Sequence, residues 1–473
     1  MKGKLWAALA ILVGASVPAS ACTNFLVTKG ASKDGSCMIS YAADSHYLYG
    51  ELYHWPAAKY PKGTMLKVYE WDSQKYLGEI EQAAETYNVV GNMNEHQLAI
   101  GETTYGGRHE LQDSTGIIDY GSLIYITLQR CKTAREAIKM ISELTERYGY
   151  ASSGESFSIA DPNEVWVMDL ISKGIDLQMN KKTKQMENTR RGMVWVARRI
   201  PDGYVCAHAN QARITTFPLA NGKTSITSKQ LNKIFNPEVE TIYAHDVISF
   251  ARQMKYFSGK DAEFSFCDAY APVDFGGARF CEVRVWSFFN SVNSEMKEYI
   301  DYAKGWNLAH KMPLWIKPDR KLDVHDVMDA MRDHYEGTPF DITTNAGAGT
   351  NGAPYRPSPL TWEYQGKKYF NERPVSTHQA SFVIVAQLRG HLPNPVGGVL
   401  WFANDEANTT PFVPIYCSLT KVPECFDDAT ANDHTFSWKS AFWLCNWVSN
   451  MVYPRYDQLY PTVAKRRDNM EEY

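Results

Sequence analysis

Apolar and polar residues alternate in short segments along much of the chain, and this alternation predicts paired β-strands. Residues 25–28 and 37–42 form two such segments, separated by a polar turn that ends in Asp34-Gly35. Two strands joined by a short turn of this kind predict a hairpin. The segments 155–160 and 165–170 predict a second hairpin. Further predicted strands are 98–104, 194–197, 204–208, 382–388 and 399–402.

A helical spacing of apolar residues follows the turn at Thr133. Thr133 and Glu136 have the spacing of a capping box, and the apolar positions up to Tyr148 recur on one face until Gly149. Residues 323–336 predict a second amphipathic helix, in which His325 and His334 are interpreted as ordinary polar or capping residues. Hairpins, helices and further hairpins in this order predict an α+β fold of stacked layers.

The first 21 residues have the pattern of an export signal. Lys2 and Lys4 precede an apolar stretch over 5–17, and Ala19-Ser20-Ala21 has the small residues that a signal peptidase recognises. The stretch is shorter than the roughly 20 residues of a membrane-spanning helix, and no comparable run follows. We therefore expect residues 1–21 to be a signal peptide, an exported product that is periplasmic or extracellular, and no integral membrane segment.

The remaining chain, 22–473, has the composition of a globular protein. A formal net charge of −4 over 473 residues indicates neither a nucleic-acid partner nor a membrane surface. Its length allows one large domain or two. The Gly-, Asn- and Pro-rich stretch 347–359 is the predicted lid or domain seam, and the charged end at 465–473 is expected to fray.

Nine cysteines leave two interpretations open. Without Cys22 eight remain, an even number that an oxidising compartment would allow to pair, with Cys417–Cys425 as the first candidate bridge. Several buried free thiols are the alternative. The chain has no C-x-x-C pair and no H-E-x-x-H helix, so neither a thiolate zinc site nor a zincin site is predicted.

Cys22 would become the first residue if the chain is cut after Ala21. It would then carry a thiol with a reference pKa of about 8.5 and an α-amine with one of about 7.7–8.0. A nucleophile and a base would be joined in one residue, because the amine can accept the thiol proton and later return it to a leaving group. The alternatives are a lipid-modified cysteine, although Ala19 is not the large aliphatic residue favoured there, and a disulfide partner.

Several motifs together resemble the cysteine dipeptidase family of the N-terminal-nucleophile hydrolases. They keep the order of the family and extend over most of 22–473: Cys22-Thr23-Asn24, Asp34-Gly35-Ser36, Asp44-Ser45, Gly154-Glu155-Ser156-Phe157-Ser158, Asp161-Pro162, Trp166, His208-Ala209-Asn210-Gln211, Arg332-Asp333-His334-Tyr335-Glu336-Gly337-Thr338-Pro339, Gly397-Gly398 and Trp401. The resemblance implies a four-layer α-β-β-α sandwich with C-terminal elaborations. It also implies hydrolysis of dipeptides or similar small amides.

The resemblance suggests a role for each candidate catalytic residue. The Cys22 thiolate would attack the scissile carbonyl, and Asp44 would hold the charged α-amine. Asn210 and a backbone N–H near Thr104 would stabilise the oxyanion. No cofactor and no metal is needed, because nucleophile and base are both protein groups. Asp44 as a turn cap and Asn210 as a partner of local backbone groups are the structural alternatives.

The chain departs from the family at Tyr41, where an arginine is usual. Arg279 and Arg284 are the candidate replacements for binding substrate or positioning the nucleophile. On a strand they would face opposite sides, so at most one would reach the pocket. Glu102 and His208 would either bind a substrate amine or cap strands, and the second interpretation is favoured.

Three functions compete at this point. The first is a secreted dipeptidase that acts on small peptides through a thioester intermediate. The second is a related amide hydrolase that acts on conjugated bile salts, N-acyl amino acids or penicillin V. The third is a non-enzymatic lipoprotein that is acylated at Cys22. The sequence leaves open whether copies associate into a homo-oligomer.

Overall fold

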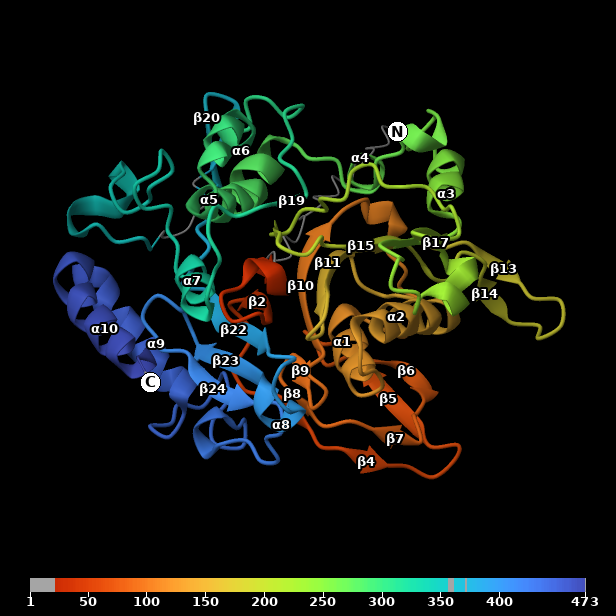
Figure 1. The fold of residues 1–473 in the computed structure, drawn as a ribbon, viewed down its shortest axis with the longest axis horizontal. Coiled ribbons are helices and arrows are strands. Elements are labelled where there is room, and N and C mark those ends of the chain that lie inside the picture. The colour runs from red at the N-terminus through yellow and green to blue at the C-terminus, as the bar shows by residue number, and fades with distance from the viewer. Residues whose placement is uncertain (1–21, 356–360, 371, 473) are drawn as a thin grey trace, which may run out of the picture.

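Two large β-sheets form the centre of the protein in the computed structural model, which describes residues 22–355, 361–370 and 372–472 (Figure 1). Within these residues the first sheet has the strand order β19 (Trp315–Ile316), β16 (Val205–His208), β1 (Asn24–Val27), β2 (Cys37–Asp44), β22 (Ala380–Leu388), β23 (Gly398–Asn404) and β24 (Val413–Tyr416). The second has the order β17 (Ser225–Thr227), β18 (Thr241–Tyr243), β15 (Met193–Arg199), β12 (Val165–Ser172), β11 (Gly154–Ala160), β10 (Ala99–Gly106), β9 (Met93–Asn94), β8 (Val89–Val90) and β3 (His54–Trp55).

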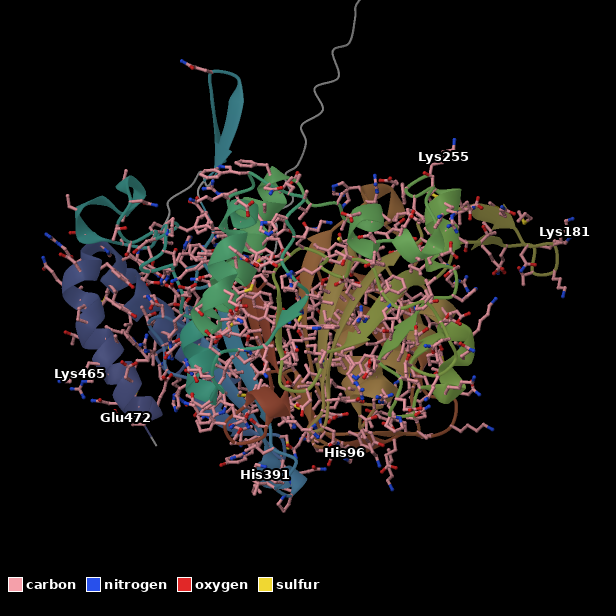
Figure 2. All side chains as sticks on the ribbon, turned by 45° about the horizontal axis from the view of Figure 1, so that its top comes forward. His96, Lys181, Lys255, His391, Lys465 and Glu472 are labelled. Carbon is pink, nitrogen blue, oxygen red and sulfur yellow. The ribbon has the colours of Figure 1, made fainter. Side chains whose placement is uncertain are left out.

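Four two-stranded ribbons and a set of helices surround these sheets in the described residues. The ribbons are β4 (Ala58–Lys59) with β7 (Glu85–Thr86), β5 (Met65–Tyr69) with β6 (Tyr76–Glu81), β13 (Leu177–Met179) with β14 (Met186–Asn188), and β20 (Thr361–Tyr364) with β21 (Lys367–Phe370). The helices are α1 (Tyr120–Leu128), α2 (Ala134–Tyr148), α3 (Val247–Gln253), α4 (Phe266–Tyr270), α5 (Val283–Val292), α6 (Ile300–Ala303), α7 (Val324–Ala330), α8 (Asn394–Gly397), α9 (Ala441–Val452) and α10 (Tyr456–Glu471). Lys181 marks the tip of the projecting β13–β14 ribbon in Figure 2.

The inner strands β16, β1, β2 and β22 of the first sheet bury both of their faces. Leu26 of β1 belongs to the core shared with the second sheet, whereas its neighbours Phe25 and Val27 belong to a core under α5 and α7. In β22, Ile384 and Val385 divide between the two cores in the same way. Successive side chains of a strand point to opposite faces, so a strand between two layers is apolar throughout. This is why β22 reads as a nearly continuous apolar run.

Helices α1 and α2 cover the second sheet on the side away from the first. Thr133 caps α2 by accepting a hydrogen bond from the Glu136 N–H, and the helix ends at Gly149, where φ is +77°. Such a left-handed φ favours glycine, which has no Cβ to clash. The buried residues of α2 include Ala137, Ile138 and Ile141, which repeat at helical spacing. The predicted helix and its two ends are therefore confirmed.

The predicted α+β class and the two predicted hairpins are confirmed. Strand β1 pairs antiparallel with β2, and β11 pairs antiparallel with β12. The export signal predicted at 1–21 lies outside the described residues. In the part of the chain that the structure describes, no helix has both the length and the apolar character needed to cross a bilayer.

Two predictions about the second half of the chain, a helix over 323–336 and a frayed end, are wrong at least in part. The helix predicted over 323–336 ends at Ala330, because Asp333 forms a turn in which its carboxylate accepts from the Tyr335 N–H. The lid or seam predicted at 347–359 stays a prediction: the 3₁₀ helix Ala346–Asn351 covers its first residues, and 356–359 lie outside the described part. The end of the chain is helical in α10 and does not fray before Glu472.

The Glu471 side chain holds the last turn of α10 in place. The buried carboxylate of Glu471 accepts hydrogen bonds from Arg332 Nη2 at 2.5 Å and from the Phe412 N–H at 2.6 Å. Lys465 and Glu472, by contrast, lie at the outer edge of the molecule in Figure 2. The charged end of the chain therefore contains a buried acid, Glu471. Its burial cannot be recognised from the sequence, because charged residues are usually exposed.

All nine cysteines lie among the described residues, and each has a free thiol. The predicted Cys417–Cys425 bridge is therefore wrong. The Cys417 thiol instead donates to the Asn394 carbonyl oxygen at 3.0 Å, in the connection between β22 and β23. The alternative interpretation, buried free thiols, describes most of these residues.

Candidate active site

Cys22 lies directly before β1, buried between the two central sheets. Its side chain is 1% exposed, and the bridge between Thr23 and Ala42 places it beside the end of β2. Gly101 of β10 permits the close approach of the second sheet, since a Cβ there would lie 3.2 Å from Tyr41 Cβ. Both the sulfur and the backbone nitrogen of Cys22 are therefore enclosed by residues from distant parts of the chain.

Asn210 holds the nitrogen of Cys22. The Cys22 backbone nitrogen donates to Asn210 Oδ1 at 2.9 Å, and Asn210 Nδ2 donates to the Thr104 carbonyl oxygen at 2.6 Å. Asn210 follows β16 with φ of +57°, a left-handed conformation that asparagine adopts more readily than most residues. The sharp turn aims its amide at Cys22, so two of the predicted site residues meet here.

Arg284 is the predicted arginine that reaches Cys22. Its Nη1 donates to the Cys22 carbonyl oxygen at 2.6 Å and to Thr23 Oγ1 at 2.8 Å. Its Nη2 donates to Asn210 Oδ1 at 2.9 Å and to the Ala209 carbonyl oxygen at 3.2 Å. Burial and the nearby Arg373 lower the pKa of Arg284 to about 10, which leaves it charged at neutral pH. The guanidinium fixes both chain segments that meet at Cys22.

Arg279 lies elsewhere. It forms an ion pair with Glu372, and its guanidinium lies over the rings of Phe275 and Phe340. The strand assumed for this stretch is wrong, because Gly277–Glu282 is a π-helical segment that leads into α5. These contacts agree with the expectation that at most one of the two arginines reaches the pocket. The cause is the turn of a helix rather than the alternation of a strand.

Asp44 ends β2 and is completely buried. Its carboxylate forms an ion pair with Arg373, which is 1% exposed. Burial raises the pKa of Asp44, while Arg373 and then Arg284 act in the opposite direction. Asp44 also approaches Cys22, since its backbone hydrogen-bonds to the Cys22 sulfur. The carboxylate thus lies in a site with two buried arginines.

Glu102 touches the thiol from the second sheet. The Cys22 Sγ donates to Glu102 Oε1 at 3.4 Å, and the Tyr41 hydroxyl donates to the same oxygen at 2.8 Å. The Asn24 amide fixes the backbone of Glu102: in the orientation that satisfies both of its atoms, it donates to the Glu102 carbonyl oxygen at 2.9 Å and accepts from the Glu102 N–H at 3.1 Å. Glu155 lies next to Glu102 and accepts from Thr104 Oγ1 at 2.8 Å.

The environment keeps the thiol protonated. Burial raises the pKa of Cys22 well above its usual value, and the carboxylates of Glu102 and Asp44 raise it further. The hydrogen bond from the Asp44 backbone acts in the opposite direction. A thiol in these surroundings needs a base at the moment of attack, because only the thiolate is a strong nucleophile.

His208 is not placed to meet a substrate. Its ring nitrogens hydrogen-bond to Thr103 Oγ1 and Ser158 Oγ, each at 2.7 Å, and it is completely buried. Burial, with a smaller contribution from Arg213, lowers the pKa of His208 to about 3. It is a neutral link between the two sheets, in agreement with the structural interpretation.

A cleft on the surface reaches the site on the side of Asn210. Its lining includes Tyr105 and Gly107 at the end of β10, Asn210 and Gln211 just after β16, and Cys281 in the π-helical segment before α5. The cleft brings solvent to the amide that holds the Cys22 nitrogen.

Comparison with known protein families decides the family of this chain. The model of one family, described as Peptidase family C69, matches residues 21–469. The chain belongs to peptidase family C69. It is therefore a hydrolase that acts on peptide bonds, and the family match begins one residue before Cys22.

Individual relatives of this C69 peptidase cover most of its length. It is 23% identical over 452 residues to a "Probable dipeptidase" of Latilactobacillus sakei, covering 92% of this chain and 82% of that protein. A "Probable dipeptidase A" of Streptococcus pyogenes serotype M3 (strain SSI-1) is 22% identical over 465 residues, covering 92% and 84%. A "Dipeptidase" of Bifidobacterium longum (strain NCC 2705) is 23% identical over 465 residues, covering 88% and 75%.

Sequence reasoning missed two groups in the site of this C69 peptidase. Arg373, which pairs with Asp44, belongs to none of the motifs found in the sequence. Glu155 was noted only as part of a motif, and Tyr41 only as a departure from the family. The available signal was an acidic residue in each of two predicted strands, at 102 and 155.

Proposed function

We propose that this C69 peptidase is an exported dipeptidase whose nucleophile is Cys22, freed as the N-terminal residue when residues 1–21 are removed. The observation that carries the proposal is that the nitrogen and the sulfur of Cys22 share one buried site, at 2.9 Å from Asn210 Oδ1 and 3.4 Å from Glu102 Oε1. The printed names of the relatives, "Probable dipeptidase" and "Dipeptidase", support the substrate class.

In the proposed reaction, the Cys22 α-amine accepts the thiol proton as sulfur attacks the scissile carbonyl carbon. An S–C bond forms and the carbonyl becomes an oxyanion. When the oxyanion collapses, the C–N bond breaks and the proton on the α-amine passes to the leaving amine. Water then attacks the thioester and gives one proton to the α-amine. The C–S bond breaks, and this proton passes from the α-amine to the sulfur. The acyl product leaves as a carboxylic acid.

The neighbours of Cys22 have distinct roles in this proposal. Asp44, beside the sulfur and opposite Arg373, favours the charged form of the α-amine while it carries the proton. Arg284 holds the Cys22 carbonyl and the Asn210 amide in fixed positions. Asn210 and a backbone N–H near Thr104 are the proposed oxyanion donors, since neutral N–H groups stabilise a developing negative charge without changing their own protonation.

We further propose that the layers form the four-layer sandwich of the N-terminal-nucleophile hydrolases. Support comes from two facing sheets with α5 and α7 outside the first and α1 and α2 outside the second. The family arginine missing at Tyr41 is replaced in this proposal by Arg284, which contacts Cys22 from α5. The C-terminal elaborations are α9 and α10 with their connections.

A substrate panel tests the proposal. The mature chain, starting at Cys22, is incubated separately with dipeptides, tripeptides, a glycine-conjugated bile salt, an N-acyl amino acid and penicillin V, and products are quantified by mass spectrometry. We expect hydrolysis of dipeptides and little of the others. Hydrolysis confined to the other amides would contradict the dipeptidase assignment, and a diacylglyceryl mass on Cys22 with no hydrolysis would identify a lipoprotein.

A further inference from the structure

Glu102 and Glu155 form a buried carboxyl pair beside the nucleophile. In the β10–β11 ladder, Glu102 is opposite Phe157, so Glu155 is its diagonal neighbour on the same face of the sheet. The two residues are 1% and 0% exposed, and their carboxyl groups hydrogen-bond to one another. Two carboxyl groups in contact cannot both be ionised at low cost, so this pair shares a proton.

The pair keeps one negative charge. Tyr41 and Cys22 both donate to Glu102 Oε1, at 2.8 and 3.4 Å, so Glu102 is the ionised partner and Glu155 the protonated one. Burial and then the carboxylate of Glu102 raise the pKa of Glu155 well above its usual value, which is the same direction. Burial also raises the pKa of Glu102, but hydrogen bonds from Glu155, Tyr41 and Cys22 oppose the shift. Glu102 therefore carries the charge, and three donors point at its carboxylate.

No basic side chain among the described residues forms an ion pair with either acid. The two arginines of the site are engaged elsewhere: Arg284 donates to Cys22, Thr23, Ala209 and Asn210, and Arg373 pairs with Asp44. In the described residues, Oε2 of Glu102 and Oε2 of Glu155 are buried and meet no other hydrogen-bonding group. A buried charge without a counter-ion is costly, and a bound cation would remove that cost.

The position of Glu102 indicates which cation this is. Within an aminoacyl group, the N–Cα and Cα–C bonds of about 1.46 and 1.52 Å place the amino nitrogen about 2.5 Å from the carbonyl carbon. The carbon under attack must approach the Cys22 sulfur, and Glu102 Oε1 is 3.4 Å from that sulfur. A carboxylate in contact with the nucleophile is thus within reach of the α-ammonium of the residue being cleaved.

We propose that Glu102, with its proton-sharing partner Glu155, is the recognition site for the free α-ammonium of the substrate residue whose carbonyl Cys22 attacks. This proposal rests on the proposed function and narrows it. The substrates are peptides cleaved after an N-terminal residue with a free amine. Amides whose acyl part lacks that ammonium leave the charge of Glu102 unpaired and are poor substrates.

The test compares two substrates that differ only in this group. Alanyl-alanine carries the ammonium, and lactoyl-alanine has a hydroxyl in its place. For the wild type, we expect kcat/KM to be at least about 100-fold higher for alanyl-alanine, because an uncompensated buried charge typically costs several kcal/mol. In Glu102→Gln, kcat/KM for alanyl-alanine should fall at least about 100-fold and that for lactoyl-alanine should change little, so that discrimination disappears.

Controls separate this proposal from the proposed function. The matched control is Glu79→Gln, the same change at an exposed residue of β6, which should retain full discrimination. The melting temperature and the circular dichroism spectrum show whether Glu102→Gln keeps its fold. If that variant does not fold, the wild-type substrate ratio alone decides.

The outcomes are distinct. Equal cleavage of both substrates by the wild type, or equal losses on both in Glu102→Gln, would overturn ammonium recognition and leave the cysteine peptidase intact. Failure of the wild type to cleave any dipeptide would instead overturn the proposed function.

Discussion

Arg284 donates a hydrogen bond of 2.6 Å to the carbonyl oxygen of Cys22, although 262 positions separate the two residues. The same guanidinium holds Asn210, so the start of β1, the end of β16 and the start of α5 meet at one cation. The candidate nucleophile is therefore positioned by contacts formed late along the chain, and its geometry depends on the complete fold.

Replacement of Arg284 should damage catalysis far more than replacement of Arg279. Arg284→Lys retains the charge but loses the planar fork that reaches Cys22, Thr23 and Asn210 at once, so kcat should fall about 10- to 100-fold. Arg279→Lys is the matched control, because Arg279 pairs with Glu372 outside these contacts. Steady-state kinetics on a dipeptide measure both variants. Equal losses would show that Arg284 has no special position.

His334 predicts a pH dependence of stability. Burial alone would lower the pKa of His334, but its hydrogen bonds and ion pairs with Glu336 and Glu406 raise it to about 9. A pKa raised on folding contributes stability that is complete below the reference value of about 6.5 and is lost as pH rises through about 9. Because Glu336 is half exposed, solvent screens part of this effect, and we expect a loss of on the order of 1–3 kcal/mol.

Urea unfolding of the wild type and of His334→Gln at pH 6, 7.5 and 9.5 measures this contribution. Other groups, including the neighbouring Asp333 and the buried thiols, titrate in both proteins, so the difference between the two curves isolates His334. The wild type should lose its advantage over the variant as the pH rises. Parallel curves would contradict the charged state of His334.

The last turn of α10 should be important for stability. Glu471→Gln leaves the Arg332 guanidinium without its buried carboxylate, which should lower the free energy of unfolding by about 3 kcal/mol. Glu472→Gln, at the exposed neighbouring residue, should have no measurable effect. Thermal and urea denaturation compare the two. Indistinguishable variants would restore the original expectation of a frayed end.

Local patterns were sufficient to predict the paired strands and helix α2, because alternation and capping are properties of a few adjacent residues. The end of α7 could not be predicted in this way, since Asp333 competes with the helix by accepting from the Tyr335 N–H. The helical ending of the chain depends on Arg332, which is far from Glu471 in sequence. In sequence, a charged segment with one buried acid cannot be distinguished from a fully exposed one unless the residue that pairs with the acid is known.

The candidate site also depends on contacts between distant residues that local patterns do not predict. Cys22 and Asn210 were identified from motifs and Arg284 as one of two candidates for the missing family arginine. The structure brings all three together. Arg373 and the acid pair formed by Glu102 and Glu155 were not recognised, because a strand pattern gives the face of a side chain but not its neighbour in another sheet. The two carboxyl groups became visible only through the register of β10 and β11.

Cys22→Ala tests the identity of the nucleophile. It should reduce dipeptide turnover at least about 10⁴-fold while leaving the melting temperature nearly unchanged, because alanine removes only the thiol. The matched control is Cys425→Ser, since Cys425 is a half-buried free thiol that lies outside the site. Substantial turnover in the alanine variant, or equal losses in both, would assign the chemistry to another group.

The most direct measurement is the intact mass and N-terminal sequence of the active, exported protein. The account predicts a chain that begins at Cys22 with a free α-amine and a free thiol, and activity that appears only after residues 1–21 are removed. A fully active enzyme that retains those residues, or whose terminal nitrogen is blocked, would contradict it.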